Sequence, residues 1–151
     1  MHSTSRILGF ITVTDQSNLY LEKHTRIGKD CYFFSKGGIH IGEGSILSRN
    51  ITIYTGNHDI NGEEIPYNDK YVLKKVIIGK GVWIGMNVNI TPGVVIGDGA
   101  IIGMGTTVSK NVDPYSIVVG AQQRVVGHRD RNCFVQNLEK DNFFAKKWPE
   151  L

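Results

Sequence analysis

The sequence from Ile78 to Asp113 reads IGKGVW, IGMNVN, ITPGVV, IGDGAI, IGMGTT, VSKNVD, which repeats one six-residue pattern six times. The first position of each repeat is aliphatic. The fifth position is always small or β-branched, with the residues Val82, Val88, Val94, Ala100, Thr106 and Val112. A period of six fits neither an amphipathic helix nor the simple alternation of one long strand. Hexapeptide repeats are typical of a parallel β-helix.

Each hexapeptide is expected to form one flat side and one corner, so that three repeats complete one triangular coil. This geometry predicts that Ile78 stacks under Ile96 and that Ile84 stacks under Ile102. The first and fifth residues are predicted to point inward, where narrow side chains let the coils stack without gaps. Glycine is expected to supply the positive φ that the corners need.

Length and composition indicate a globular chain of one domain. The chain has 151 residues, of which 40% are hydrophobic and 21% are charged. These values are those of a folded globular protein. A net charge of +3 is too small to indicate a nucleic-acid partner, and none is expected. Basic residues become denser after residue 120, as in a solvated terminal segment or a site for a phosphorylated ligand: Arg124, Arg129, Arg131, Lys140, Lys146 and Lys147.

The two cysteines, Cys31 and Cys133, do not make a disulfide framework. Cys31 occupies the fifth, inward position of the early repeat IGKDCY and is expected to be a small core residue. No apolar run has the length of a membrane span, and the N-terminus lacks the apolar core of a signal peptide. We therefore expect no membrane span and a cytoplasmic location.

The chain divides into three expected segments of one domain. Residues 1–26 are predicted to be an N-terminal cap with short strands that cover the open end of the solenoid. Residues 27–126 are predicted to form the β-helix. Residues 127–151 are predicted to form a C-terminal helical tail, because Phe134, Leu138 and later Phe144 and Trp148 recur at roughly helical spacing.

The repeat fails between residues 59 and 75, and this interruption is the longest in the β-helix segment. An irregular loop of that length inside a compact fold is usually functional or disordered. Apolar and aromatic residues give it side chains that can pack, among them Ile60, Tyr67 and Tyr71. We interpret the loop as an ordered arm that leaves one corner of the prism.

His58 is the candidate catalytic residue, since it lies in TGNHD where the repeat ends and the loop begins. A neutral imidazole can accept a proton from a hydroxyl near neutral pH and return it. Three histidines, His24, His40 and His58, also raise the possibility of zinc. They have no close pairing in the sequence, so no metal is expected.

The segments TIYTGNHDI and VIIGKGVWIGMNVNITPGVVIGDGAIIGMGTTVSKNVDPYSIVVGAQQRVV resemble the hexapeptide-repeat acyltransferases. The similarity is greatest to sugar O-acetyltransferases of the maltose and galactoside type and to polysaccharide-modifying enzymes, and it covers roughly residues 27–126. The resemblance implies an all-β fold. In this fold a left-handed parallel β-helix carries an extended loop and a short C-terminal helix.

The resemblance also implies roles for single residues. His58 is similar to the family's general base. The positions similar to those that bind coenzyme A are Trp83, Gly85, Met86, Met104, Ser109, Lys110 and Arg124. The resemblance also implies that Trp83 flanks the acceptor, that Ser109 and Lys110 lie near the far end of the coenzyme, and that Arg124 meets its phosphates. The other expected acceptor-binding residues are Asn57, Asp59 and Tyr67.

The function that the resemblance implies is acetyl transfer from acetyl-CoA to a hydroxyl of a sugar or polysaccharide precursor. It further implies a homotrimer, with coenzyme A between adjacent prisms and the arm reaching toward a neighbour. Two alternatives remain open from the sequence. One is N-acetylation of an amino sugar, including a nucleotide-linked one. The other is a non-catalytic β-helix used only for assembly.

Overall fold

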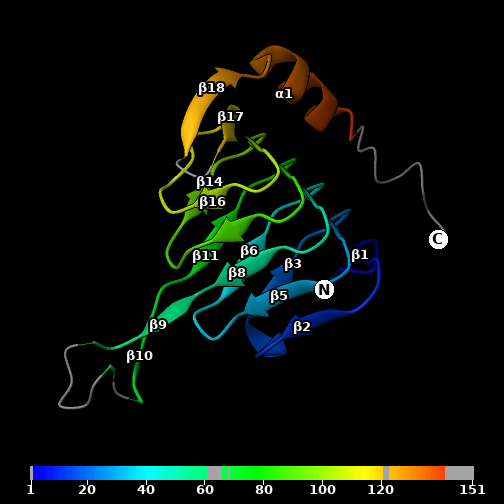
Figure 1. The fold of residues 1–151 in the computed structure, drawn as a ribbon. Coiled ribbons are helices and arrows are strands. Elements are labelled where there is room, and N and C mark those ends of the chain that lie inside the picture. Colours follow the sequence, from blue (N-terminus) through cyan, green and yellow to red (C-terminus); the bar gives the residue numbers. More distant parts are fainter. Residues whose placement is uncertain (1, 61–65, 68, 121–122, 142–151) are drawn as a thin grey trace.

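The computed structural model describes residues 2–60, 66–67, 69–120 and 123–141. Over these residues the chain winds as a left-handed parallel β-helix, and its short strands stack into three sheets (Figure 1). The sheets form the sides of a triangular prism, which confirms the fold that the hexapeptide period predicted. We call them face 1, face 2 and face 3, in the order in which the chain passes through them.

The strands of each face pair in sequence order along the prism. Face 1 contains β1 (Arg6–Ile7), β4 (Arg26–Ile27), β7 (Ile46–Leu47), β12 (Trp83–Ile84), β15 (Ile101–Ile102), β17 (Ser116–Val119) and β18 (Arg124–His128). Face 2 contains β2 (Ile11–Val13), β5 (Cys31–Phe34), β8 (Thr52–Tyr54), β13 (Asn89–Ile90) and β16 (Thr107–Val108). Face 3 contains β3 (Leu19–Leu21), β6 (Ile39–Ile41), β11 (Val76–Ile78) and β14 (Val95–Ile96). Only the last pair of face 1, β17 with β18, is antiparallel among the described strands of the faces.

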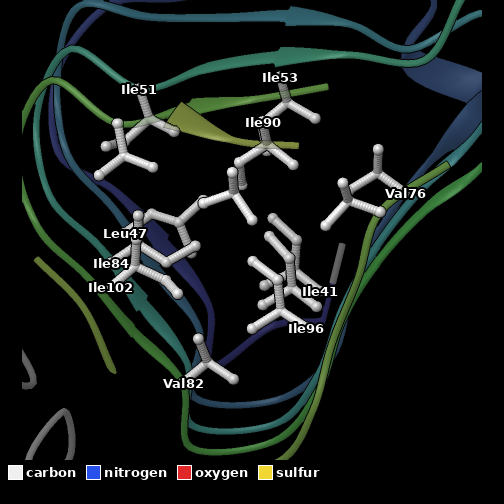
Figure 2. Packing of buried hydrophobic residues seen from close by; sticks show 14 of the residues in the cluster. Ile41, Leu47, Ile51, Ile53, Val76, Val82, Ile84, Ile90, Ile96 and Ile102 are labelled. Atoms are coloured by element: carbon white, nitrogen blue, oxygen red, sulfur yellow. The ribbon is translucent and has the colours of Figure 1, made fainter. Parts of the chain in front are cut away.

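The interior of the prism is filled by the first and fifth residues of the repeats, as predicted. None of these side chains between Ile78 and Asp113 is more than 4% exposed. The predicted stacking is also confirmed, since Ile78 pairs with Ile96 and Ile84 pairs with Ile102. Figure 2 shows these aliphatic side chains meeting along the axis of the prism.

Glycines serve two different purposes at the corners. Positive φ occurs at the fourth position of the repeat, for example at Gly81 and Gly99, with Asn87 taking the same conformation. The second-position glycines have no positive φ, but they lie against the next coil. A Cβ on Gly97 would lie 2.5 Å from the backbone nitrogen of Pro114, and one on Gly85 would lie 2.7 Å from that of Met104. Close stacking of the coils therefore requires glycine at these two positions.

The first coil begins at Arg6, earlier than the sequence indicated. Strands β1, β2 and β3 occupy all three faces and pair in parallel with β4, β5 and β6. Residues 6–21 therefore extend the β-helix by one coil and do not form a separate cap over its end. The hexapeptide repeat is too weak in this segment to predict the coil. A short 3₁₀ turn, η1 (Gln16–Asn18), replaces one regular corner.

The arm leaves the prism between face 2 and face 3. Strands β9 (Gly56–His58) and β10 (Tyr71–Leu73) pair antiparallel and form what we call the arm ribbon, which projects from one corner (Figure 1). The break in the coil therefore comes at Gly56, slightly before the predicted end at His58. Val76 returns the chain to the prism, where its amide donates to the carbonyl of Gly38.

The C-terminal helix α1 (Arg131–Glu139) runs across the corner between face 3 and face 1. The Asp130 carboxylate caps its first turn by accepting a hydrogen bond of 2.9 Å from the amide of Cys133. Phe134 packs on Gly81 and Gly99. These contacts confirm the predicted helix over part of its expected length. Phe144 and Trp148, which were also expected in the tail, lie outside the described residues.

No helix among the described residues is long and apolar enough to cross a membrane.

Candidate functional site

His58 is the last residue of β9 and lies directly opposite Tyr71 of β10 in the arm ribbon. Its imidazole centroid lies 3.8 Å from the ring of Tyr67 and 4.3 Å from the ring of Tyr71, with interplanar angles of 15° and 36°. Two rings at these distances cannot share one face of the imidazole without overlapping. The imidazole is therefore stacked between the two tyrosines and is half-buried.

Tyr71 connects His58 to further aromatic rings on face 2. Phe34 lies 5.3 Å from Tyr71, Tyr54 lies 5.1 Å from Phe34, and Tyr32 lies 5.7 Å from Tyr54. Burial, followed by the hydrogen bond to the Tyr32 hydroxyl, raises the pKa of Tyr54 above its ordinary value. We call this series, from Tyr32 through Tyr54, Phe34 and Tyr71 to His58 and Tyr67, the aromatic row. The aromatic row thus runs from the wall of the prism through the candidate base to Tyr67.

A cation also lies beside the aromatic row. The ammonium group of Lys36 is 4.7 Å from the ring centroid of Tyr71 and 5.7 Å from that of Phe34. Lysine over an aromatic face is attracted by the negative charge density of the ring. Among the described residues no carboxylate lies within ion-pair distance of Lys36, and its side chain is exposed beside the arm ribbon.

The predicted acceptor residues Asn57 and Asp59 flank His58 in the chain. Asn57 pairs with Val72 across the arm ribbon, and the amide of Asp59 donates to the carbonyl of Lys70. Side chains alternate between the two faces of a strand. Asn57 therefore belongs to the opposite face of the arm ribbon from His58, and its role in binding the acceptor stays a prediction.

Three of the residues predicted to bind coenzyme A lie at the corner between face 1 and face 2. Gly85 and Met86 follow β12, and Met104 follows β15 one coil further along. The two turns stack, because the amide of Gly105 donates to the carbonyl of Met86 at 2.9 Å. Met86 and Met104 are both exposed. These residues form an accessible methionine-lined edge.

Ser109 and Lys110 lie at a different corner, between face 2 and face 3. They follow β16 and are exposed, on the corner from which the arm ribbon with His58 departs two coils earlier. Arg124 is exposed at the start of β18, where it pairs with Val119. Within one copy, face 2 therefore separates His58 from Met86 and Met104. One prism alone does not bring the predicted base and the edge of Met86 and Met104 into one pocket.

Trp83 lies on the outer side of face 1, 54% exposed, and lines a groove of about 470 Å³ beneath α1. Ile46 and Ile101 of face 1 line the groove with it, as do Cys133 and Asn137 of α1. No sequence pattern predicted this groove. Its one sequence signal was the helical spacing of Phe134 and Leu138, which says nothing about the face that the helix covers.

The three histidines that suggested a metal lie in three different parts of the structure. His40 on face 3 is hydrogen bonded to Glu22 at 2.9 Å, and His24 lies 4.0 Å from Asp141 beyond the end of α1. His58 lies in the arm ribbon. Over the described part of the chain, no group of three or more histidine, cysteine, aspartate or glutamate residues is arranged to hold a metal ion.

Comparison with known proteins identifies the repeats. Residues 75–110 match the family described as bacterial transferase hexapeptide (six repeats), and residues 19–55 match the hexapeptide repeat of succinyl-transferase. The fold is similar to the crystal structure of a maltose O-acetyltransferase from Clostridium difficile 630, with a TM-score of 0.76 and 32% identity. That similarity covers 83% of this chain and 68% of the other.

Curated proteins are similar to this chain in sequence as well. The chain is 36% identical over 110 residues to nodulation protein L of Rhizobium meliloti, covering 73% of this chain and 60% of that protein. It is 30% identical over 107 residues to galactoside O-acetyltransferase of Escherichia coli, covering 69% of this chain and 52% of that protein. The chain thus spans about three-fifths of the length of the first curated relatives that it matches.

Proposed function

The chain belongs to the hexapeptide-repeat acyltransferases, and from this premise we propose that it transfers an acetyl group from acetyl-CoA to a hydroxyl group. The proposed acceptor is a sugar or a polysaccharide precursor, and the proposed location is the cytoplasm. The observation that carries the proposal is the placement of His58. It is a half-buried imidazole, held between two tyrosines, at the one point where the arm interrupts the solenoid.

His58 acts as the general base in the proposed mechanism. Its imidazole accepts the proton of the acceptor hydroxyl while the oxygen attacks the thioester carbonyl, and the resulting imidazolium gives that proton to the departing thiolate. Proton transfer of this kind contributes about 10²–10⁴-fold to the rate. A backbone N–H near Met86 is the proposed donor to the oxyanion that forms during attack.

Coenzyme A is proposed to bind along the exposed edges described above. Trp83, Gly85, Met86 and Met104 would line the pantetheine, since the missing Cβ of Gly85 leaves the backbone accessible. The basic residues Lys110 and Arg124, with Ser109, would meet the phosphates at the other end of the coenzyme.

We propose that the complete site lies between copies of the chain in a homotrimer. His58 and the edge of Met86 and Met104 belong to different corners of one prism, so a neighbouring copy must supply one of them. A threefold arrangement presents the corner of each prism to the next and closes on itself. The arm ribbon of one copy would then reach the methionine-lined edge of its neighbour.

The test is thiol release from acetyl-CoA by the purified protein over a panel of sugars and sugar nucleotides. Replacing His58 with alanine is expected to lower kcat by about 10²–10⁴-fold. The matched control is His40→Ala, which removes a histidine that is bonded to Glu22 on face 3, and it is expected to keep the wild-type rate. Both variants should keep the wild-type melting temperature.

Three results would change the proposal. Full turnover by His58→Ala would exclude its role as the base. Turnover of an amino sugar in preference to its hydroxyl analogue would redirect the activity to N-acetylation. Absence of both coenzyme A binding and thiol release would favour a β-helix used only for assembly.

A further inference from the structure

We propose that Tyr71 is a positioning residue that holds the imidazole of His58 in its reactive orientation, and that Phe34 anchors Tyr71 to the wall of the prism. This inference rests on the proposed function, because it takes His58 to be the general base. It concerns a residue that touches the base and not one that touches the acceptor. Tyr71 would therefore act on the rate through His58.

The location of His58 creates the need for such a residue. The imidazole lies on a two-stranded ribbon that projects from the prism (Figure 1), and it is not on one of the stacked faces. A two-stranded hairpin is only marginally stable by itself. Proton transfer, however, requires the base within hydrogen-bond reach of the acceptor, and small displacements lower the rate strongly. A side-chain contact between the arm ribbon and a rigid part of the prism is therefore needed to hold the imidazole in place.

The contacts of Tyr71 provide that connection. Tyr71 is the cross-strand partner of His58, and their ring centroids are 4.3 Å apart. On the prism side it meets Phe34 at 5.3 Å. Phe34 is the last residue of β5 and is only 7% exposed, with Tyr54 stacked against it at 5.1 Å. Two ring contacts thus lead from the wall of the prism to the imidazole.

The orientation of the imidazole follows from its two neighbours. Tyr71 covers one face of the ring and Tyr67 covers the other. Nδ1 and Nε2 lie in the plane of the imidazole, which stacking on its two faces fixes. An acceptor hydroxyl must approach a ring nitrogen in that plane to transfer its proton, so the two tyrosines set the direction of approach.

The experiment is a double-mutant cycle between Tyr71 and His58, measured as steady-state thiol release. Tyr71→Leu removes the aromatic ring and is expected to lower kcat by about 10–100-fold while KM changes by less than about threefold. Tyr71→Phe keeps the ring and is expected to stay within about twofold of wild type. Tyr20→Leu, which changes an exposed tyrosine on the edge strand β3, is the control for a general effect of losing a tyrosine.

The cycle separates positioning from a general structural role. In the His58→Ala background, Tyr71→Leu is expected to change the remaining rate by less than about twofold, because the residue through which it acts is gone. Equal losses in both backgrounds would overturn the proposal, and so would an unchanged kcat in Tyr71→Leu. Equal damage by Tyr71→Phe and Tyr71→Leu would assign the effect to the hydroxyl and not to stacking.

A spectroscopic measurement tests the geometry without activity. The ring protons of His58 are expected to be shifted upfield by the two tyrosine rings in the NMR spectrum, and Tyr71→Leu should remove part of that shift while Tyr71→Phe keeps it. An unchanged shift in Tyr71→Leu would contradict the stacking. If His58→Ala keeps full activity, the proposed function fails. If His58→Ala loses activity but Tyr71→Leu does not, only the positioning role fails.

Discussion

At the scale of single residues, the close spacing between coils depends on the missing Cβ atoms of the second-position glycines. The second-position glycines have ordinary backbone angles, yet a Cβ at several of them would meet the backbone of the next coil at less than 3 Å. Backbone atoms cannot move away as the end of a flexible side chain can. The repeat therefore uses these glycines for close approach and uses the fourth-position residues for positive φ.

Gly97→Ala is expected to destabilise the fold by about 1–3 kcal/mol, because its Cβ would lie 2.5 Å from the Pro114 nitrogen. The matched control is Gly127→Ala in β18, where a Cβ would meet nothing within 4 Å and the φ angle is not positive. That change should alter the free energy of unfolding by less than about 0.5 kcal/mol. Chemical denaturation of the two variants measures the difference, and equal stabilities would contradict this account of the second position.

The candidate base shows which residue roles the sequence can indicate. His58 was predicted from its place at the end of the repeat, and the structure shows it half-buried between two rings. Tyr71 and Phe34 were not predicted as parts of the site. No sequence spacing relates residues 34, 58 and 71. Their ring contacts depend on the register of the arm ribbon and on the position of the ribbon beside face 2.

At the scale of elements, α1 is attached mainly through one side chain. Phe134 lies against Gly81 and Gly99, meets the ring of Tyr115 edge-on at 5.3 Å, and lies 4.9 Å below the guanidinium of Arg129. The absence of side chains at the two glycines makes the space that the phenyl ring occupies. The helix is therefore expected to open locally if this ring is removed.

Phe134→Ala is expected to speed hydrogen exchange of the α1 amides by at least about tenfold, because the helix loses its main apolar contact. Amides in the β-helix core should keep their wild-type protection. Gln136→Ala, on the exposed side of the same helix, is the control and should leave the exchange unchanged. Equal exchange rates of the α1 amides in wild type and in Phe134→Ala would show that α1 is held by other contacts.

At the scale of the whole molecule, the prism distributes its candidate functional residues over two corners. His58 leaves the corner between face 2 and face 3, and Met104 lies at the corner between face 1 and face 2. A rigid solenoid cannot fold these corners onto each other. If the proposed chemistry occurs, one site must combine residues of two copies.

Mixing two inactive variants tests this arrangement. His58→Ala removes the base, and Met104→Trp fills the proposed pantetheine path on the other corner. Each alone is expected to be inactive. Trimers assembled at random from equal amounts should recover about a quarter of the wild-type activity, because about one interface in four then has both intact halves.

The readout is thiol release after the two variants have been dissociated together and reassembled, with light scattering to confirm trimers. Each variant treated alone is the control. A monomer at working concentration, or mixed trimers without any recovered activity, would contradict a site between copies.

The sequence by itself determined the β-helix, its inward residues and the stacking of Ile78 on Ile96 and Ile84 on Ile102, because these follow from a local period that each repeat obeys. It also located His58, because an interruption in a regular repeat is visible in the sequence. Only the tertiary structure decided that the coil starts at Arg6, that Tyr71 stacks on His58, that Trp83 and α1 line one groove, and that His58 and Met104 lie at different corners. These features depend on contacts between residues distant in the chain, and no repeating pattern specifies which distant surfaces meet.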